Sequence, residues 1–147
     1  MDKIIIYTDG GSRGNPGPSA IGVVIANKKN QVIKKYSHYL GDNLTNNQAE
    51  YEAVIFGLKK IKALYGKKKA KGYEIELKTD SELLVSQLNG KFKILDSKIQ
   101  SLFIKTWNLK LDFKKVKFSH IPREENAEAD YLVNEALGEK SKAQKLF

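Results

Sequence analysis

The chain has 147 residues, enough for one domain with a core, and its 41% hydrophobic and 29% charged residues are typical of a folded protein rather than a disordered or membrane-spanning one. It has no cysteine for a disulfide or a thiolate metal site, and its first residues lack the long apolar stretch of a signal peptide, so we expect a cytoplasmic protein that makes no membrane contact. The net charge of +9, almost all of it from lysine, favours a polyanionic partner such as nucleic acid, although the same surplus would also serve solubility alone.

The first half of the chain predicts three strands and a long helix. Short runs rich in β-branched residues, separated by glycine, proline or asparagine, predict the strands Lys3–Asp9, Ala20–Ala26 and Val32–Leu40. Thr45 followed three residues later by Gln48 is a capping box, which predicts a helix from Thr45 to about Tyr65.

The second half predicts two strands and three helices. Alternating or apolar runs predict strands at Tyr73–Thr79 and Val116–Ile121. Apolar residues at helical spacing predict the helices Ser81–Leu88, Ile99–Leu109 and Glu124–Leu137, the last of them ended by Gly138. This order indicates a mixed sheet with helices packed on it. We expect residues 1–138 to form the domain and residues 139–147 to form a loose basic tail.

Four carboxylates occupy positions that ordinary surface acids do not. Counting back from the buried stripe of each helix places Glu50 and Asp130 on the core-facing side, where an acid is costly unless it is paired or bound to a metal. Asp9 ends the first strand and Asp80 ends the fourth, and ligand sites form at the carboxyl ends of neighbouring strands. Oxygen ligands without cysteine favour Mg²⁺ or Mn²⁺.

Each acid also has a purely structural interpretation. Asp80 would cap the helix that follows it, Asp9 would belong to a turn before two glycines, and Glu50 would suit the dipole of its helix. Asp130, in the middle of a predicted helix, is the hardest to explain in this way. Because inward-facing acids are rarely left without a partner, four of them together favour a metal site.

Four short segments carry these acids: Tyr7–Pro18, Thr45–Glu50, Thr79–Ser81 and Asn126–Asp130. In this order and at these spacings they resemble the four motifs of ribonuclease H, type 1. The resemblance implies an α/β fold of the ribonuclease H type, with a five-stranded mixed sheet of three antiparallel strands followed by two parallel ones, flanked by helices. It also implies an endonuclease that hydrolyses the RNA strand of RNA–DNA hybrids and leaves 3′-hydroxyl and 5′-phosphate ends. We expect it to act as a monomer.

The same resemblance implies two Mg²⁺ ions per site, with Mn²⁺ as a substitute. Asp9 would bridge both ions. Asp130 would help to hold the ion that activates the attacking water, and Glu50 and Asp80 would hold the ion that stabilises the leaving 3′ oxygen.

Further residues of these motifs are implied to bind the substrate. Asn15, Asn46 and Asn47, together with Gln48, would contact the hybrid, whose RNA strand is distinguished from DNA by its 2′-hydroxyls in the minor groove. Thr45 would line a pocket for a phosphate of the DNA strand, a role compatible with its role as a helix cap.

The chain departs from the family pattern in three places. The segment between the third and fourth acids is too short for a basic, tryptophan-rich substrate handle, so Lys91 and Lys93 would supply a weaker grip on the substrate, or else are ordinary surface residues. We expect no hybrid-binding module before the catalytic domain. His120 keeps the family's spacing to Asp130 but lies in a stiffer segment, where it would either assist turnover or pack beside Phe118. Arg123 would then contact the phosphate instead.

Two rival functions remain at this point. The first is a different nuclease of the same fold, such as an exonuclease or a junction resolvase. Exonucleases of this fold carry an acid two residues after the first aspartate, and Gly11 at that position counts against them. A non-catalytic hybrid-binding domain would gain nothing from clustered negative charge that faces phosphate. The chain's end weakly resembles sliding-clamp-binding peptides through Gln144, Leu146 and Phe147.

Overall fold

The computed structural model describes the backbone of residues 2–146 and the side chains of residues 2–138. Its strands are β1 (Lys3–Ser12), β2 (Gly17–Asn27), β3 (Val32–Leu44), β4 (Glu74–Thr79) and β5 (Lys115–His120). Its helices are α1 (Asn46–Tyr65), α2 (Lys67–Ala70), α3 (Glu82–Leu88), α4 (Ser97–Lys110) and α5 (Ala127–Leu146), the last preceded by a 3₁₀ turn, η1 (Arg123–Asn126). No helix in this described part of the chain is long and apolar enough to cross a membrane.

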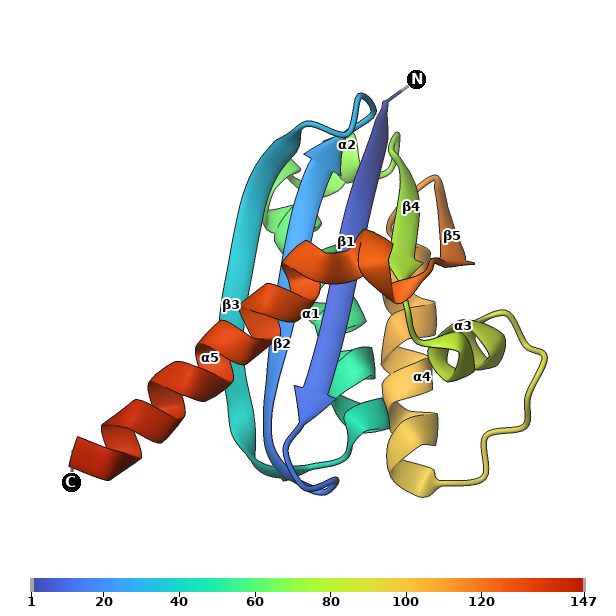
Figure 1. Ribbon diagram of the computed structural model, residues 1–147. Coiled ribbons are helices and arrows are strands. Elements are labelled where there is room, and N and C mark those ends of the chain that lie inside the picture. Colours follow the sequence, from blue (N-terminus) through green and yellow to red (C-terminus); the bar gives the residue numbers. More distant parts are fainter. Residues whose placement is uncertain (1, 147) are drawn as a thin grey trace.

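The strands form one mixed sheet in the order β3-β2-β1-β4-β5 (Figure 1). β1 and β3 both pair antiparallel with β2, whereas β4 pairs parallel with both β1 and β5. The predicted α/β class and the five-stranded mixed sheet are therefore confirmed. The parallel pairing of β1 with β4 matters most for function, because it places the carboxyl end of β4 beside the middle of β1.

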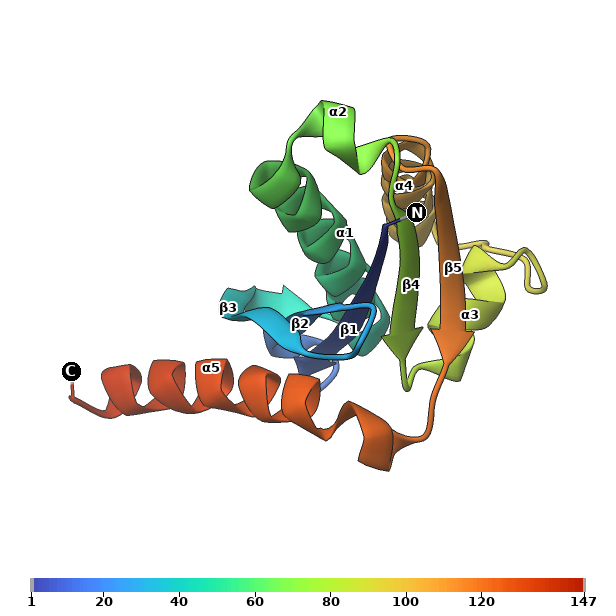
Figure 2. The same cartoon turned by 90° about the horizontal axis from the view of Figure 1, so that it is seen from above.

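Helices cover the two faces of the sheet unequally (Figure 2). α1 and α4 lie on one face, and the main core forms between them and the sheet around fully buried side chains such as Ile6, Leu58 and Leu77. α5 lies on the other face, where Val133 and Leu137 pack in a smaller cluster. Burial of these apolar side chains is the main force that holds the layers together.

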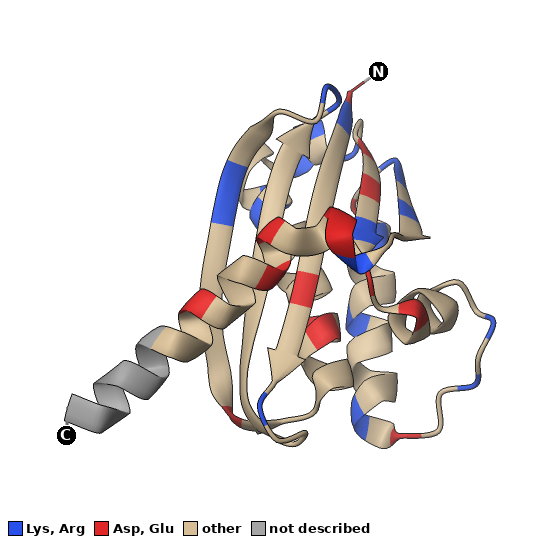
Figure 3. Ribbon diagram, viewed as in Figure 1, with Lys and Arg blue, Asp and Glu red and all other residues tan. Residues whose placement is uncertain are grey.

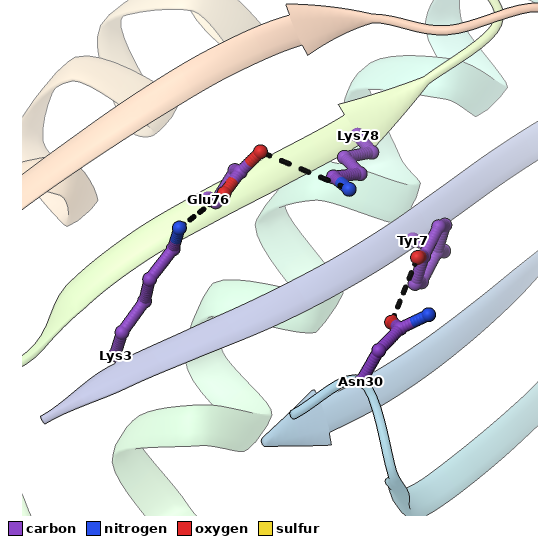
Figure 4. A network of polar contacts seen from close by, with 5 residues as sticks. All are labelled: Lys3, Tyr7, Asn30, Glu76 and Lys78. Atoms are coloured by element: carbon purple, nitrogen blue, oxygen red, sulfur yellow. Dashed lines mark hydrogen bonds and ion pairs between the residues drawn. The ribbon is translucent and has the colours of Figure 1, made fainter. Parts of the chain in front are cut away.

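The face of the sheet on the α5 side also carries a polar network (Figure 4). The ammonium group of Lys3 lies 2.6 Å from a carboxylate oxygen of Glu76, and that of Lys78 lies 3.8 Å from the other oxygen. The Tyr7 hydroxyl donates a hydrogen bond of 2.8 Å to Oδ1 of Asn30. These charges suit a sheet face that is open to water.

Several predicted boundaries are wrong. β1 continues to Ser12, because the residues after Asp9 go on pairing with β2, so Asp9 lies inside the strand instead of at its end. β3 is likewise longer than predicted, and α2 was not predicted. The helix predicted from Glu124 begins as the turn η1.

The predicted end of the last helix at Gly138 is also wrong, since α5 continues to Leu146. One glycine inside a helix costs only about 1 kcal/mol relative to alanine, and good helix formers follow it. The backbone of residues 139–146 therefore continues α5 instead of forming a loose tail. The side chains of Gln144, Leu146 and Phe147 lie outside the described residues.

Candidate active site

The four carboxylates identified in the sequence line one polar cavity of about 340 Å³. Asp9 comes from β1, Glu50 from α1, Asp80 from the residue after β4, and Asp130 from α5. Acidic positions on these elements lie close together in Figure 3. The fold therefore brings together acids from four separate parts of the chain.

Two glycines allow the helices to approach the sheet at this point. A Cβ atom on Gly10 would lie 2.4 Å from the backbone carbonyl of Ala49, so only glycine lets the start of α1 carry Glu50 to β1. Gly22 pairs with Asp9 across β1 and β2, and a Cβ there would lie 2.1 Å from the carbonyl oxygen of Ala129 in α5. The second glycine therefore makes room for the turn of α5 that carries Asp130.

Asp80 is fixed by a buried asparagine that sequence analysis placed in a motif without giving it a role. The amide nitrogen of Asn126 donates to Oδ1 of Asp80 at 2.8 Å and to the backbone carbonyl of Thr8 at 2.9 Å. The next residue, Ser81, caps α3 and hydrogen-bonds with Glu50. The loop after β4 is thus tied both to β1 and to α1.

The site strongly disfavours negative charge. Burial, followed by the charges of Asp80, Asp130 and Glu50, raises the pKa of Asp9 from its ordinary 3.8 to about 8. Burial also raises the pKa of Glu50 to about 7, although its hydrogen bond with Ser81 acts in the opposite direction. Asp9 and Asp130 share a side-chain hydrogen bond. A bound cation would stabilise the ionised form of these carboxyl groups and lower their pKa values.

The donor set suits a hard divalent cation, because the four carboxylates that line the cavity offer only oxygen ligands. Within residues 2–138, however, no three acidic or histidine side chains already stand in an arrangement that would hold one ion. Ligation of one ion by three of these carboxylates would therefore require them to come closer together than they stand here.

The predicted substrate-binding residues lie beside this cavity. Thr45 and Gln48 form the predicted capping box, with hydrogen bonds of 3.1 Å and 2.8 Å between each side chain and the other residue's backbone N–H. The side chain of Asn15 accepts a hydrogen bond from the backbone of Asn46, whose own Oδ1 accepts one from Ser12. These bonds tie the loop after β1 to the start of α1.

Four of the predicted substrate-binding residues line two adjoining cavities. Asn46 lines the acidic cavity. Thr45, Asn47 and Gln48 line a second cavity of about 420 Å³, which also includes Lys98 near the start of α4. The structure therefore places the polar residues of the second motif next to the acids and leaves room for a second group beside them.

Asn47 is held by a residue that sequence analysis missed. Gln87, which is almost fully buried in α3, accepts hydrogen bonds from the amide of Asn47 at 3.4 Å and from the hydroxyl of Tyr51 at 3.0 Å. A glutamine in an otherwise apolar helix stripe was the available signal. Asn47 keeps one buried amide oxygen without a partner among the described residues.

Positive charge reaches the acidic cavity from both of the chain's arginines. Arg123, just after β5, lines the cavity, and so does Arg13, to which sequence analysis gave no role. His120 lies at the end of β5, is exposed and does not line the cavity. Lys91 and Lys93 are exposed in the loop between α3 and α4.

Comparisons with known proteins agree with this fold. Residues 7–136 match the family model described as reverse transcriptase-like. A ribonuclease HI of Halobacterium salinarum is 36% identical over 92% of this chain, and a bifunctional protein of Mycobacterium tuberculosis is 33% identical over the same share. The chain spans 64% of the first relative and 35% of the second.

This chain matches two similar solved structures over nearly their whole length. LC11-RNase H1, isolated from compost by a metagenomic approach, superposes with a TM-score of 0.88 at 45% identity over 95% of this chain and 99% of its own. The same enzyme in complex with an RNA/DNA hybrid gives a TM-score of 0.87 at 44% identity, over 93% of this chain and 98% of its own. With the family model, the fold and the four motifs in agreement, this chain belongs to the ribonuclease H family, type 1.

Proposed function

We propose that this protein is an endonuclease that hydrolyses the RNA strand of RNA–DNA hybrids and leaves 3′-hydroxyl and 5′-phosphate ends. One observation carries the proposal: four carboxylates from four elements of a ribonuclease H fold surround a single cavity. The solved complex of LC11-RNase H1 with an RNA/DNA hybrid supports the choice of substrate. The chain would act as a monomer in the cytoplasm, with residues 1–138 as its catalytic domain.

The proposed cofactor is Mg²⁺, with two ions per site and Mn²⁺ as a substitute. Asp9 would contact both ions, Asp130 would serve one of them, and Glu50 and Asp80 would serve the other. Bound there, such ions lower the pKa of the attacking water and stabilise charge on the leaving oxygen. The raised pKa values of Asp9 and Glu50 support this assignment, because a divalent cation would stabilise the ionised carboxylates and so offset the effects of burial and of mutual repulsion.

The polar residues around the acids would select the hybrid. Asn15, Asn46 and Asn47 would contact the minor groove, where the RNA 2′-hydroxyls mark one strand. Gln48 and Thr45 would act at the second cavity, where a DNA-strand phosphate would meet polar groups and the positive charge of Lys98. Hydrogen bonds already fix this segment, so little ordering would be needed on binding.

A cleavage assay tests the proposal directly. An end-labelled RNA–DNA hybrid is incubated with Mg²⁺, Mn²⁺ or EDTA, beside single-stranded RNA, duplex RNA and duplex DNA. We expect internal cuts in the RNA of the hybrid alone, with either metal and not with EDTA. Mononucleotides released only from an end would indicate an exonuclease, and binding without cleavage would indicate an adaptor domain.

A matched pair of variants links the assay to the cavity. Glu50→Gln removes a carboxylate that lines the cavity, whereas Glu52→Gln changes an acid of the same helix that does not. We expect the first to lose at least about a hundredfold in rate and the second to stay near wild type. Equal activity of the two variants would contradict the assignment of the site.

A further inference from the structure

α4 carries two apolar stripes on opposite sides. One stripe, centred on Ile99 and Leu102, is buried against the core. The other consists of Ile104 and Trp107 together with Leu111, which caps the end of the helix; they are spaced three and four residues apart, and all three side chains are largely exposed. A helix that only separates core from solvent needs one apolar stripe, so the second stripe calls for its own explanation.

The loop before α4 enlarges this exposed surface. Phe92 and Leu95 lie in that loop, and with Ile104, Trp107 and Leu111 they form a set of large apolar side chains that are 45–85% exposed. We call these five residues the α4 outer surface. A hollow of about 460 Å³ lies between the loop and α4, and Phe92 and Ile104 are among the residues that line it. Large apolar side chains that are exposed together along one helix and the loop before it often mark an interaction site.

This surface is separate from the candidate active site. α4 lies on the face of the sheet opposite α5, which supplies Asp130 (Figure 2). None of the five residues lines the acidic cavity or the cavity beside it. Catalysis by the four carboxylates therefore leaves the surface unexplained.

The charge around the surface has one sign. The segment 89–112 contains lysines at positions 91, 93, 98, 105 and 110, and within the described residues none of them forms an ion pair. The two acids of the segment are already engaged, because Asp96 caps α4 and Asp112 pairs with Lys62 at 2.6 Å. These lysines thus have no acidic partner among the described residues, and the ammonium group of Lys110 lies against Trp107 of the surface itself.

We propose that the α4 outer surface binds an acidic amphipathic helix of a partner protein. The spacing of Ile104, Trp107 and Leu111 matches the ridge against which the apolar face of such a helix packs. Glutamates and aspartates beside that apolar face would meet the surrounding lysines, which gives the surface its selectivity for acidic partners.

Two other occupants fit less well. A second copy of this chain would bring two lysine-bordered surfaces together, and like charges would repel. Single-stranded nucleic acid needs free aromatic faces for its bases. Here the Lys110 ammonium lies 3.8 Å from the centre of the Trp107 ring, which also stacks with Phe103, and three of the five side chains are aliphatic.

Selection from a random 16-residue peptide library displayed on phage tests the proposal on the full chain. Peptides are selected on the wild type and counter-selected on Ile104→Ser/Leu111→Ser, a variant expected to keep wild-type cleavage of the hybrid. We expect enriched peptides that combine two or three large apolar residues at helical spacing with an excess of acids. Trp107 is the only tryptophan, so its fluorescence reports binding of the synthesised peptides at the surface itself.

The variants decide between the occupants. Affinity should fall about tenfold or more in Ile104→Ser/Leu111→Ser, and by a similar factor in Lys105→Glu/Lys110→Glu, which should also lose the salt dependence. Enriched peptides without an excess of acids, or affinities that both variants leave unchanged, would overturn the proposal. So would a fluorescence response to single-stranded DNA in place of peptide, or self-association in sedimentation that the Ile104→Ser/Leu111→Ser variant abolishes.

Discussion

Asn126 holds Asp80 beside β1, since its side-chain amide donates 2.8 Å and 2.9 Å hydrogen bonds to Asp80 and to the carbonyl of Thr8. Asn126 is only 2% exposed, so water cannot easily replace these bonds. The pair shows how a residue without charge can set the position of a proposed metal ligand. Groups of this kind affect metal affinity and activity without touching the ion.

Asn126→Ala should lower the cleavage rate about 10- to 100-fold and raise the Mg²⁺ concentration needed for half-maximal rate. Asp80 loses the donor that orients it, so part of the loss should be recovered at high Mg²⁺. The measurement is a Mg²⁺ titration of initial rates. Asn89→Ala, at an exposed asparagine that ends α3, serves as the control. A rate defect that no Mg²⁺ concentration relieves would argue against this role.

Asp9→Asn should abolish cleavage, by about a thousandfold or more, and raise the stability of the protein in EDTA. The pKa of Asp9 is about 8 in the folded state and 3.8 ordinarily, so the folded state binds this proton more tightly. Its contribution to stability is therefore complete below pH ~4 and is lost as the pH rises towards about 8. In thermal melts, the melting temperature of Asp9→Asn relative to that of the wild type should therefore rise as the pH increases across that range.

Glu76→Gln gives the opposite pH dependence and is the control for these melts. The hydrogen bond from Lys3 lowers the pKa of Glu76, so its ionised form stabilises the fold at neutral pH and the effect is lost as the pH falls below the ordinary value of 4.5. Glu76→Gln should therefore lower the melting temperature at pH 8 more than in acid. If both variants shift melting in the same direction at pH 8, the charge argument fails.

Gly10→Ala and Gly138→Ala are the same substitution with opposite expected results. At Gly10 the new methyl group would overlap the backbone of Ala49, so we expect a loss of about 1–3 kcal/mol in unfolding free energy and a large loss of activity as Glu50 is displaced. At Gly138 nothing lies within 4 Å, and alanine in a helix should add about 0.5–1 kcal/mol. Denaturant melts measure both. A destabilising Gly138→Ala would show that α5 does not continue through this residue as a helix.

Gly10, Gly138 and Gln87 show where prediction from the sequence succeeds and where it stops. Periodicity was enough to locate the strands and to predict that Glu50 and Asp130 face inward, because those patterns are local. It did not reveal that Gly10 must touch Ala49, nor that Gln87 would meet Asn47, since both contacts join distant segments. At Gly138 the local rule failed, because the small cost of one glycine was outweighed by the helix formers around it.

Lys91→Ala/Lys93→Ala should weaken hybrid binding and reduce the slope of log affinity against log salt by about two, if each lysine contacts a phosphate. Lys67→Ala/Lys69→Ala is the matched control, because these lysines are also exposed but lie in α2, near the other end of the sheet (Figure 1). Binding to the hybrid is measured in Mg²⁺-free buffer over a range of salt concentrations. The same slope in both double variants would indicate that Lys91 and Lys93 are ordinary surface residues that do not contact phosphate.

Arg123→Ala should lower turnover at least as much as His120→Ala, and neither should approach the loss from Asp9→Asn. Arg123 lines the acidic cavity with a permanent charge, so it can contact a phosphate held there. His120 is exposed at the end of β5 and lies outside the cavity lining, where it could reach the substrate only as a proton carrier or during product release. Steady-state rates of the three variants, measured from pH 6 to 9, separate these roles. A severe loss in His120→Ala, with Arg123→Ala near wild type, would reverse the assignment and make His120 the residue that assists turnover.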